Sequence, residues 1–315
     1  MIIIIEQIVK LSILAILGIL AVKLKFLKLD YSEGISKLLI KITIPLLVFT
    51  TFSKFDISSV SIINFFIVIV FSIISTLILY ILSLSGVKIF KLDDLNAPLH
   101  KVQTMFGNVV FLGFPLINSL FPGGEGLIYA ALFQLGHDAV LWTLGIVIIK
   151  NQKDNNIFKE IKHLLNPVTI SFILGVIFML LKIPIPDLIF NPLFNLGHTT
   201  IYISMIYVGI ILTKADYVSL LKNKKSYFLS LNKLLIGPLI VLGILFMLRQ
   251  IGISINKTAA LVIVLQTAMP CMIIISVLAQ EFGLSVKQSV ENIFVTSVLS
   301  IITLPLLFYL SFILL

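Results

Sequence analysis

The chain has 315 residues, of which 59% are hydrophobic and only 12% are charged, and its mean hydropathy is +1.16. A water-soluble domain needs a polar face on nearly every helix or strand, which this composition cannot supply. The formal net charge of +9 would suggest nucleic-acid binding in a soluble protein, but here the lysines lie between apolar runs and form no basic helix face. The composition therefore indicates an integral membrane protein.

Ten apolar runs follow one another along the chain, and each is long enough to cross a bilayer as a helix of about 20 residues. They are residues 2–22, 34–52, 60–85, 98–121, 125–149, 164–181, 189–213, 226–248, 255–279 and 286–314. Because the runs are continuous, they predict helices and not the alternating strands of a β-barrel. The first run lacks a cleavage pattern and further runs follow it, so we interpret it as a retained helix and not a signal peptide. The expected fold is an all-α polytopic membrane protein with ten spans.

Turn residues separate several of these runs. Gly124 ends a Pro-Gly-Gly turn after the fourth run, Gly252 follows the eighth and Gly283 follows the ninth. Ser285 is then placed to cap the tenth helix through Gln288.

The lysines and arginines predict an orientation. The loops that follow odd-numbered spans, with the residues beside them, contain 17 lysines and arginines, whereas the loops that follow even-numbered spans contain 4. The positive-inside rule then puts the odd-numbered loops in the cytoplasm and both termini outside the cell membrane.

Ten spans divide into two sets of five, in residues 1–149 and 164–315. An odd number of spans per set turns the second set upside down relative to the first, which is the inverted-repeat plan of many secondary transporters. The fourth span of each half carries an interior proline, Pro115 in the fourth span of the chain and Pro270 in the ninth.

These prolines predict two broken helices. Proline removes a backbone donor and clashes with the preceding turn, and Gly113 makes the fourth span easier to open. A break inside lipid persists only where protein or a wet cavity lines it, and the helix N-termini exposed there carry partial positive charge that suits a carboxylate. The alternative is that both prolines are simple kinks. The candidate substrate-binding residues around the two breaks are Asn108, Gly113, Pro115, Gln266, Thr267, Ala268, Pro270 and Cys271.

Several other polar residues within the spans could have either a functional or a structural role. His137 and Asp138, at the middle of the fifth span, are candidates for proton or ion coupling, or form a neutral pair that joins helices. Glu291 in the tenth span has the same two readings. Lys233 is expected to snorkel at a helix end. Cys271 has no evident His or Asp partner, which argues against a nucleophile.

Motifs along the whole chain resemble the auxin efflux carrier family, which includes the plant PIN-FORMED proteins and prokaryotic organic-acid permeases. Asn108, Gly113 and Pro115 look like the fourth-helix signature, and Gln266, Ala268 and Pro270 look like the ninth. Shorter resemblances occur at Ile44-Pro45, Trp142-Thr143, Asn166-Pro167 and Gly237-Pro238.

The resemblance implies a bile-acid-transporter-like fold that works by an elevator motion. Helices 1, 2, 6 and 7 would form a scaffold, and helices 3–5 and 8–10 would carry the crossed helices 4 and 9. Asn108 would contact the substrate carboxylate, Pro115 and Pro270 would mark the crossing, and a homodimer would be compatible with the family. The loop at 150–163 is short and residues 60–85 carry no ionisable side chain, unlike plant members, so a microbial-type carrier is expected.

The expected function is secondary transport of a small organic anion such as a malate-like dicarboxylate, with substrate and bilayer as the partners. A sodium-coupled symporter and a passive channel are the alternatives. The chain has no ATP-binding loop and no serine, zinc or paired-aspartate protease motif, so neither primary pumping nor an enzyme is expected. The sequence predicts no cofactor, no metal and no nucleic-acid partner.

Overall fold

A computed structural model describes residues 2–54, 62–150, 167–213 and 223–315. Within these ranges every regular element is a helix, and the only strand-like feature is one bridge between Gly107 and Cys271. The starts of the third and sixth expected spans and residues 151–163 of the short loop lie outside the described residues.

The helices follow the expected runs closely, with π-helical segments written η. They are α1 (Ile2–Lys23), α2 (Tyr31–Leu38), η1 (Leu39–Thr43), α3 (Ile44–Ser53), α4 (Ile62–Ile89), α5 (Asn96–Met105), η3 (Val109–Gly113), α6 (Phe114–Leu120), α7 (Glu125–Val140), η4 (Leu141–Gly145), α8 (Ile146–Lys150), α10 (Pro167–Leu180), α11 (Asp187–Leu212), α13 (Lys224–Leu231), η6 (Asn232–Ile236), α14 (Gly237–Gln250), α15 (Lys257–Thr267), α16 (Ile274–Glu281) and α17 (Val286–Leu314).

Six helical stretches of the described chain are long and apolar enough to cross a membrane: Tyr31–Ser53, Ile63–Ile89, Glu125–Lys150, Asp187–Leu212, Lys224–Gln250 and Val286–Leu314. Four shorter apolar stretches accompany them: Ser12–Lys23, Val109–Leu120, Pro167–Leu180 and Lys257–Thr267. Each of the ten expected ranges overlaps one of these stretches. The protein is therefore an all-helical, polytopic membrane protein.

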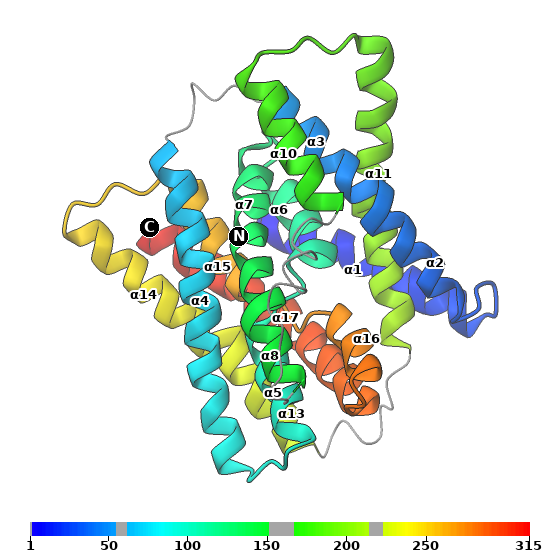
Figure 1. Cartoon of the computed structure of the whole chain (residues 1–315), viewed down its shortest axis with the longest axis vertical. Helices are drawn as coiled ribbons and strands as arrows, with labels where there is room; N and C mark the ends of the chain where they lie inside the picture. Colours follow the sequence, from blue (N-terminus) through cyan, green and yellow to red (C-terminus); the bar gives the residue numbers. More distant parts are fainter. Residues whose placement is uncertain (1, 55–61, 151–166, 214–222) are drawn as a thin grey trace.

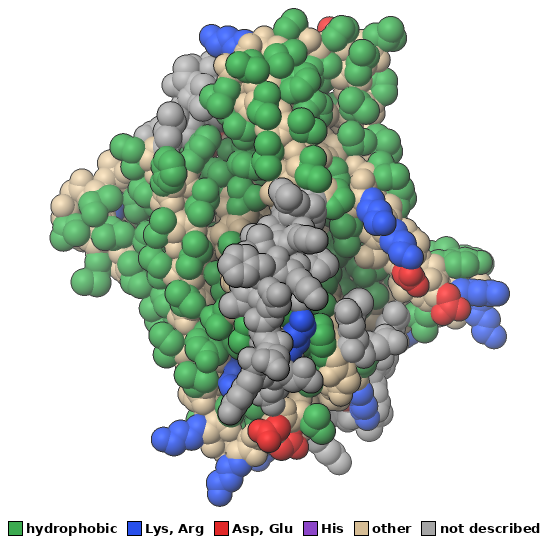
Figure 2. Space-filling view, viewed as in Figure 1, with side chains coloured by type: hydrophobic (Ala, Val, Ile, Leu, Met, Phe, Trp, Pro, Cys, Tyr) green, Lys and Arg blue, Asp and Glu red, His purple; other side chains and the backbone are tan. Residues whose placement is uncertain are grey.

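The surface has the character of a membrane protein. Hydrophobic side chains cover most of the face in Figure 2, while charged side chains gather at its lower end and right-hand edge. Many large apolar side chains are exposed, among them Phe66, Leu188 and Ile302. An exposed apolar belt of this kind is stable when lipid covers it.

The helices pack in two groups. α1 packs on α11, and α3 packs on both α10 and α11. In the second group α4 contacts α7, α15 contacts both, and α13 packs on α17. Figure 1 shows α4 and α14 along one side and α10 and α11 on the other, with α7 between them.

Prolines explain three of the π-helical segments. Pro45, Pro115 and Pro238 each lie at the second residue of the α-helix that follows η1, η3 or η6. Proline cannot donate a backbone hydrogen bond and its ring pushes away the carbonyl one turn earlier, so the preceding turn widens. The expected turns are also present, since Gly124, Gly252 and Gly283 all have positive φ angles and the Ser285 hydroxyl accepts the Gln288 N–H at 3.3 Å.

Candidate functional site

Two helices are interrupted deep in the protein, and their interruptions pair with each other. The chain is not helical between the end of α5 at Met105 and the start of η3, nor between the end of α15 and the start of α16. The N–H of Asn108 donates to the carbonyl of Pro270 at 2.7 Å, and the N–H of Met272 donates to the carbonyl of Phe106 at 3.0 Å. The freed backbone groups of each break are thus satisfied partly by the other break.

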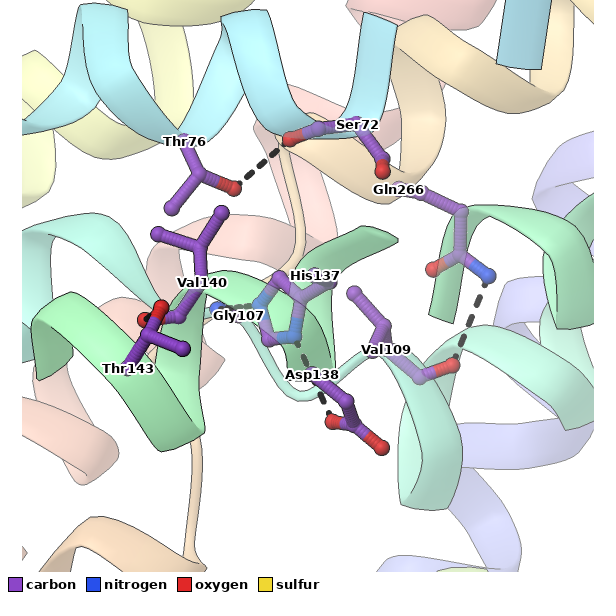
Figure 3. Close-up of polar contacts among 9 residues, drawn as sticks. All are labelled: Ser72, Thr76, Gly107, Val109, His137, Asp138, Val140, Thr143 and Gln266. Carbon is purple, nitrogen blue, oxygen red and sulfur yellow. Dashed lines mark hydrogen bonds and ion pairs between the residues drawn. The ribbon is translucent and has the colours of Figure 1, made fainter. Parts of the chain in front are cut away.

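His137 of α7 supports the first break from the side. Its Nε2 accepts the backbone N–H of Gly107 at 3.2 Å (Figure 3). The ring packs edge-on against Phe106, with the centroids 5.2 Å apart, and it is 2% exposed. Because Nε2 accepts a hydrogen bond, the ring proton resides on Nδ1, which lies 3.9 Å from Oδ1 of Asp138. His137 is a neutral, internal support of the break.

Gln266 connects the second break to η3. Its Nε2 donates to the carbonyl of Val109 at 3.4 Å (Figure 3). The same amide lies directly over Gly113, where a Cβ atom would collide with Oε1 of Gln266. The glycine therefore permits the close approach of the two interrupted helices.

A cavity of about 110 Å³ adjoins the paired breaks. This volume exceeds what a few waters need and is enough for a small carboxylate. It is lined by Ile40, Asn108, Val110, Phe111, Gln134, Asp138, Leu141, Trp142, Val168, Met272 and Ile274. The lining thus includes residues from the first turn of each helix that follows a break: Val110 and Phe111 of η3, and Ile274 of α16.

Asn108 and Gln134 supply neutral hydrogen-bonding groups to the cavity. No hydrogen bond from the Asn108 side chain to another described residue is present, although its backbone N–H and carbonyl are both engaged. Oε1 of Gln134 is buried and likewise has no partner within the described chain. A buried amide without a partner is costly, and a ligand in the cavity would remove that cost.

Several of the expected site residues lie beside the cavity and do not line it. The Thr267 hydroxyl donates to the carbonyl of Ile263 in its own helix at 2.7 Å. The Cys271 thiol is fully buried and donates to the carbonyl of Gln103 at 3.3 Å. Ala268 ends α15, and Pro270 contributes its carbonyl to the pairing. Gly113 and Pro115 lie beyond the break, at the end of η3 and the start of α6.

Glu291 lies in another part of the protein. It accepts the side-chain N–H of Asn223 at 3.0 Å and has the ammonium of Lys287 4.0 Å away. Asn223 caps the start of α13 by accepting the Ser226 N–H, so Glu291 holds the beginning of α13 against α17. These contacts favour the structural reading of Glu291.

Lys233 does not snorkel, contrary to expectation. It is 0% exposed, and its ammonium donates to the carbonyl of Thr104 at 3.0 Å. Thr104 lies in the last turn of α5, where carbonyls without intrahelical partners gather and a cation is favoured. Lys233 therefore stabilises the helix end that the break creates.

Residues 3–308 match the sequence model of a family described as "Membrane transport protein". The chain belongs to that family. The resemblance to auxin efflux carriers is thereby confirmed, since this is their family. An uncharacterised transporter of Methanothermobacter thermautotrophicus is 27% identical to this membrane transport protein over 305 residues, covering 96% of each chain. An uncharacterised transporter of Methanocaldococcus jannaschii is 26% identical over 302 residues, covering 93% of this chain and 94% of its own. Family and relatives indicate a transporter and not an enzyme.

Gln134 of this membrane transport protein was not selected from the sequence, and Trp142 was noted only in a motif that resembles the family, not as a candidate site residue. Gln134, Asp138 and Trp142 are spaced four residues apart, which places them along one face of the helical segment formed by α7 and η4. Gln134 lies one helical turn before Asp138 in an otherwise apolar span, and this spacing was the signal from which Gln134 could have been predicted.

Proposed function

We propose that this protein is a secondary carrier that moves a small organic anion, such as a malate-like dicarboxylate, across the cell membrane. The observation that carries the proposal is the pairing of two helix breaks beside a small cavity with unpartnered amides. The first N–H groups of a helix lack intrahelical acceptors, and Val110, Phe111 and Ile274 bring two such helix starts to the cavity lining. Helix starts and amides together provide donors for a carboxylate without a fixed cation.

We further propose ten membrane spans in two inverted repeats, residues 1–149 and 164–315, with the fourth and ninth spans crossing at their breaks. Both termini would lie outside the cell. In the elevator motion that the family resemblance implies, α1, α2, α3, α10 and α11 would form the scaffold and the other helices would move. The packing of the helices in two groups supports this division. The cavity has lining residues from both groups, Ile40 and Val168 from the first and Asn108 from the second.

The test is transport by the purified protein in proteoliposomes, using labelled monocarboxylates and dicarboxylates. We expect saturable uptake that the same unlabelled carboxylate inside the vesicles accelerates, because a carrier exchanges its substrate across alternating states. Flux that neither saturates nor shows countertransport would mean a channel. Uptake that requires sodium would instead support the symporter alternative.

Asn108→Ala should abolish saturable binding of the carboxylate while the protein remains folded. Thr267→Val is the matched control, since the Thr267 hydroxyl is bonded within its own helix and lines no part of the cavity. Unchanged affinity in Asn108→Ala would remove Asn108 from the site.

A further inference from the structure

A larger cavity, of about 360 Å³, lies between the two groups of helices. Its lining residues come from α1 and α11 of the first group and from η3, α6 and α17 on the other side. All of them belong to the described part of the chain, and none of them also lines the cavity beside the breaks. The larger cavity is therefore a separate site.

This cavity is elongated. On α1 its lining runs along one face from Ser12 to Lys23, which is roughly 16 Å of helix at about 1.5 Å per residue. On α17 the lining runs from Phe294 to Leu304, again along several turns. A volume of about 360 Å³ spread over such a length suits a chain-like molecule better than a compact one.

The lining is almost entirely apolar. Leu116, Met205 and Leu304 are buried and form its inner part. The hydroxyl of Ser300, also in the lining, donates to the carbonyl of Ser297 in its own helix at 2.7 Å. An apolar cavity of about 150 Å³ already stays dry and binds benzene, because water there would lack polar partners. The larger cavity therefore favours an apolar occupant.

The cavity also borders the surface that lipid covers. Ile16, Val298 and Ile301 belong to its lining and are each roughly half exposed, as part of the apolar belt. Lys23, the last residue of α1, is exposed and lines the cavity as well. A molecule that enters from the lipid thus finds a long apolar slot with a charged side chain at the end of α1. The acyl chain and the phosphate headgroup of a phospholipid have the same arrangement.

We propose that this cavity binds one acyl chain of a membrane phospholipid, with the headgroup at the Lys23 end. The chain packs against α1 and α11 on one side and against α6 and α17 on the other, so it fills the boundary between the two groups of helices. It also contacts Leu112 of η3, four residues after Asn108, and so lies against the helix that follows the first break. The bound lipid is then a structural part of the protein and not an exchangeable neighbour.

Native mass spectrometry of the purified full chain, titrated with palmitoyl-oleoyl phosphatidylglycerol, tests the site. For the wild type we expect one phospholipid to bind at a lower concentration than all further ones. Ala15→Phe on α1 and Ser297→Phe on α17 place a ring in the cavity from two sides. Each should weaken this first binding about tenfold, which corresponds to about two methylene groups that no longer find apolar surroundings.

Leu17→Phe is the matched control, because Leu17 lies on α1 and is 50% exposed but does not line the cavity. It should bind the first phospholipid as the wild type does. Thermal unfolding midpoints in detergent show which variants are folded, and variants on two walls make the result independent of either one.

Chain length tests the site in the wild type alone. A lysophospholipid with a palmitoyl chain should displace the first phospholipid, whereas one with a hexanoyl chain should not, because the short chain fills only part of the slot.

Equal first binding in the wild type and in folded Ala15→Phe and Ser297→Phe overturns the lipid site, and so does equal displacement by the long and the short lysophospholipid. Free palmitate that binds as tightly as the phospholipid and displaces it would overturn the phospholipid as the occupant, since no headgroup would then be needed. None of these measurements involves transport, so the carrier function is tested separately.

Discussion

The side-chain amide of Gln266, in α15, lies against the backbone of Gly113, in η3, so the contact joins the two interrupted helices. The same amide donates to the carbonyl of Val109, so one side chain at the end of α15 contacts both the first and the last residue of η3. The shape of η3 therefore depends on the position of α15.

Gly113→Ala should destabilise the protein by about 1–3 kcal/mol, because the added methyl group has no room beside Gln266. Gly243→Ala in α14 is the control, since nothing lies within 4 Å of the position its Cβ would take. Thermal unfolding in detergent measures both variants. The loss should shrink when Gln266→Ala accompanies Gly113→Ala, and strict additivity of the two changes would refute the contact.

Lys233→Met should also lower stability, by about 1–3 kcal/mol, because the buried carbonyl of Thr104 loses its donor. Lys101→Met is the matched control, since Lys101 belongs to the same helix as Thr104 but is only partly buried. Equal unfolding midpoints for the two variants would show that the end of α5 does not need the ammonium group.

Gln134→Met keeps the volume of the side chain and removes both of its hydrogen-bonding groups. If the Gln134 amide holds the substrate, affinity should fall about tenfold, the usual effect of losing one hydrogen bond of about 1.4 kcal/mol. Equilibrium binding of the transported carboxylate measures the change. Affinity equal to that of the wild type would mean that the unpartnered oxygen of Gln134 does not face the bound ligand.

Cys271 should resist thiol reagents in the folded protein. Its side chain is 0% exposed and its thiol hydrogen is engaged with the Gln103 carbonyl. Mass spectrometry after treatment with a maleimide should find Cys271 unmodified in mild detergent and modified in denaturant. Rapid modification of the folded protein, slowed by substrate, would instead extend the site to residue 271.

The sequence predicted the elements whose physical signals are local. Apolar runs of sufficient length marked the helices, glycines at positive φ lie in three of the expected turns between helices, and Ser285 capped the last helix. A break in each of the fourth and ninth spans was predicted, from Pro115 with Gly113 in the fourth and from Pro270 in the ninth. The first break nevertheless lies at Phe106–Asn108, well before Pro115, whose effect is the widened turn of η3.

Side-chain directions near the breaks could not be predicted in the same way. A π-helical turn adds a residue and rotates the side chains that follow, so a period of 3.6 residues misplaces them. Lys233 lies within η6 and points inward, although its position near a helix end suggested solvent. Thr267 bonds to its own helix because a threonine hydroxyl can reach the carbonyl four residues earlier, an option that spacing alone does not exclude.

The two backbone bonds that join Asn108 to Pro270 and Met272 to Phe106 have a mechanical consequence. Sliding one interrupted helix past the other would break both bonds, so they favour joint movement of the two breaks. In the proposed carrier, a substrate bound at Asn108 would then move together with the paired breaks, and the helices facing the breaks would be the part of its surroundings that changes.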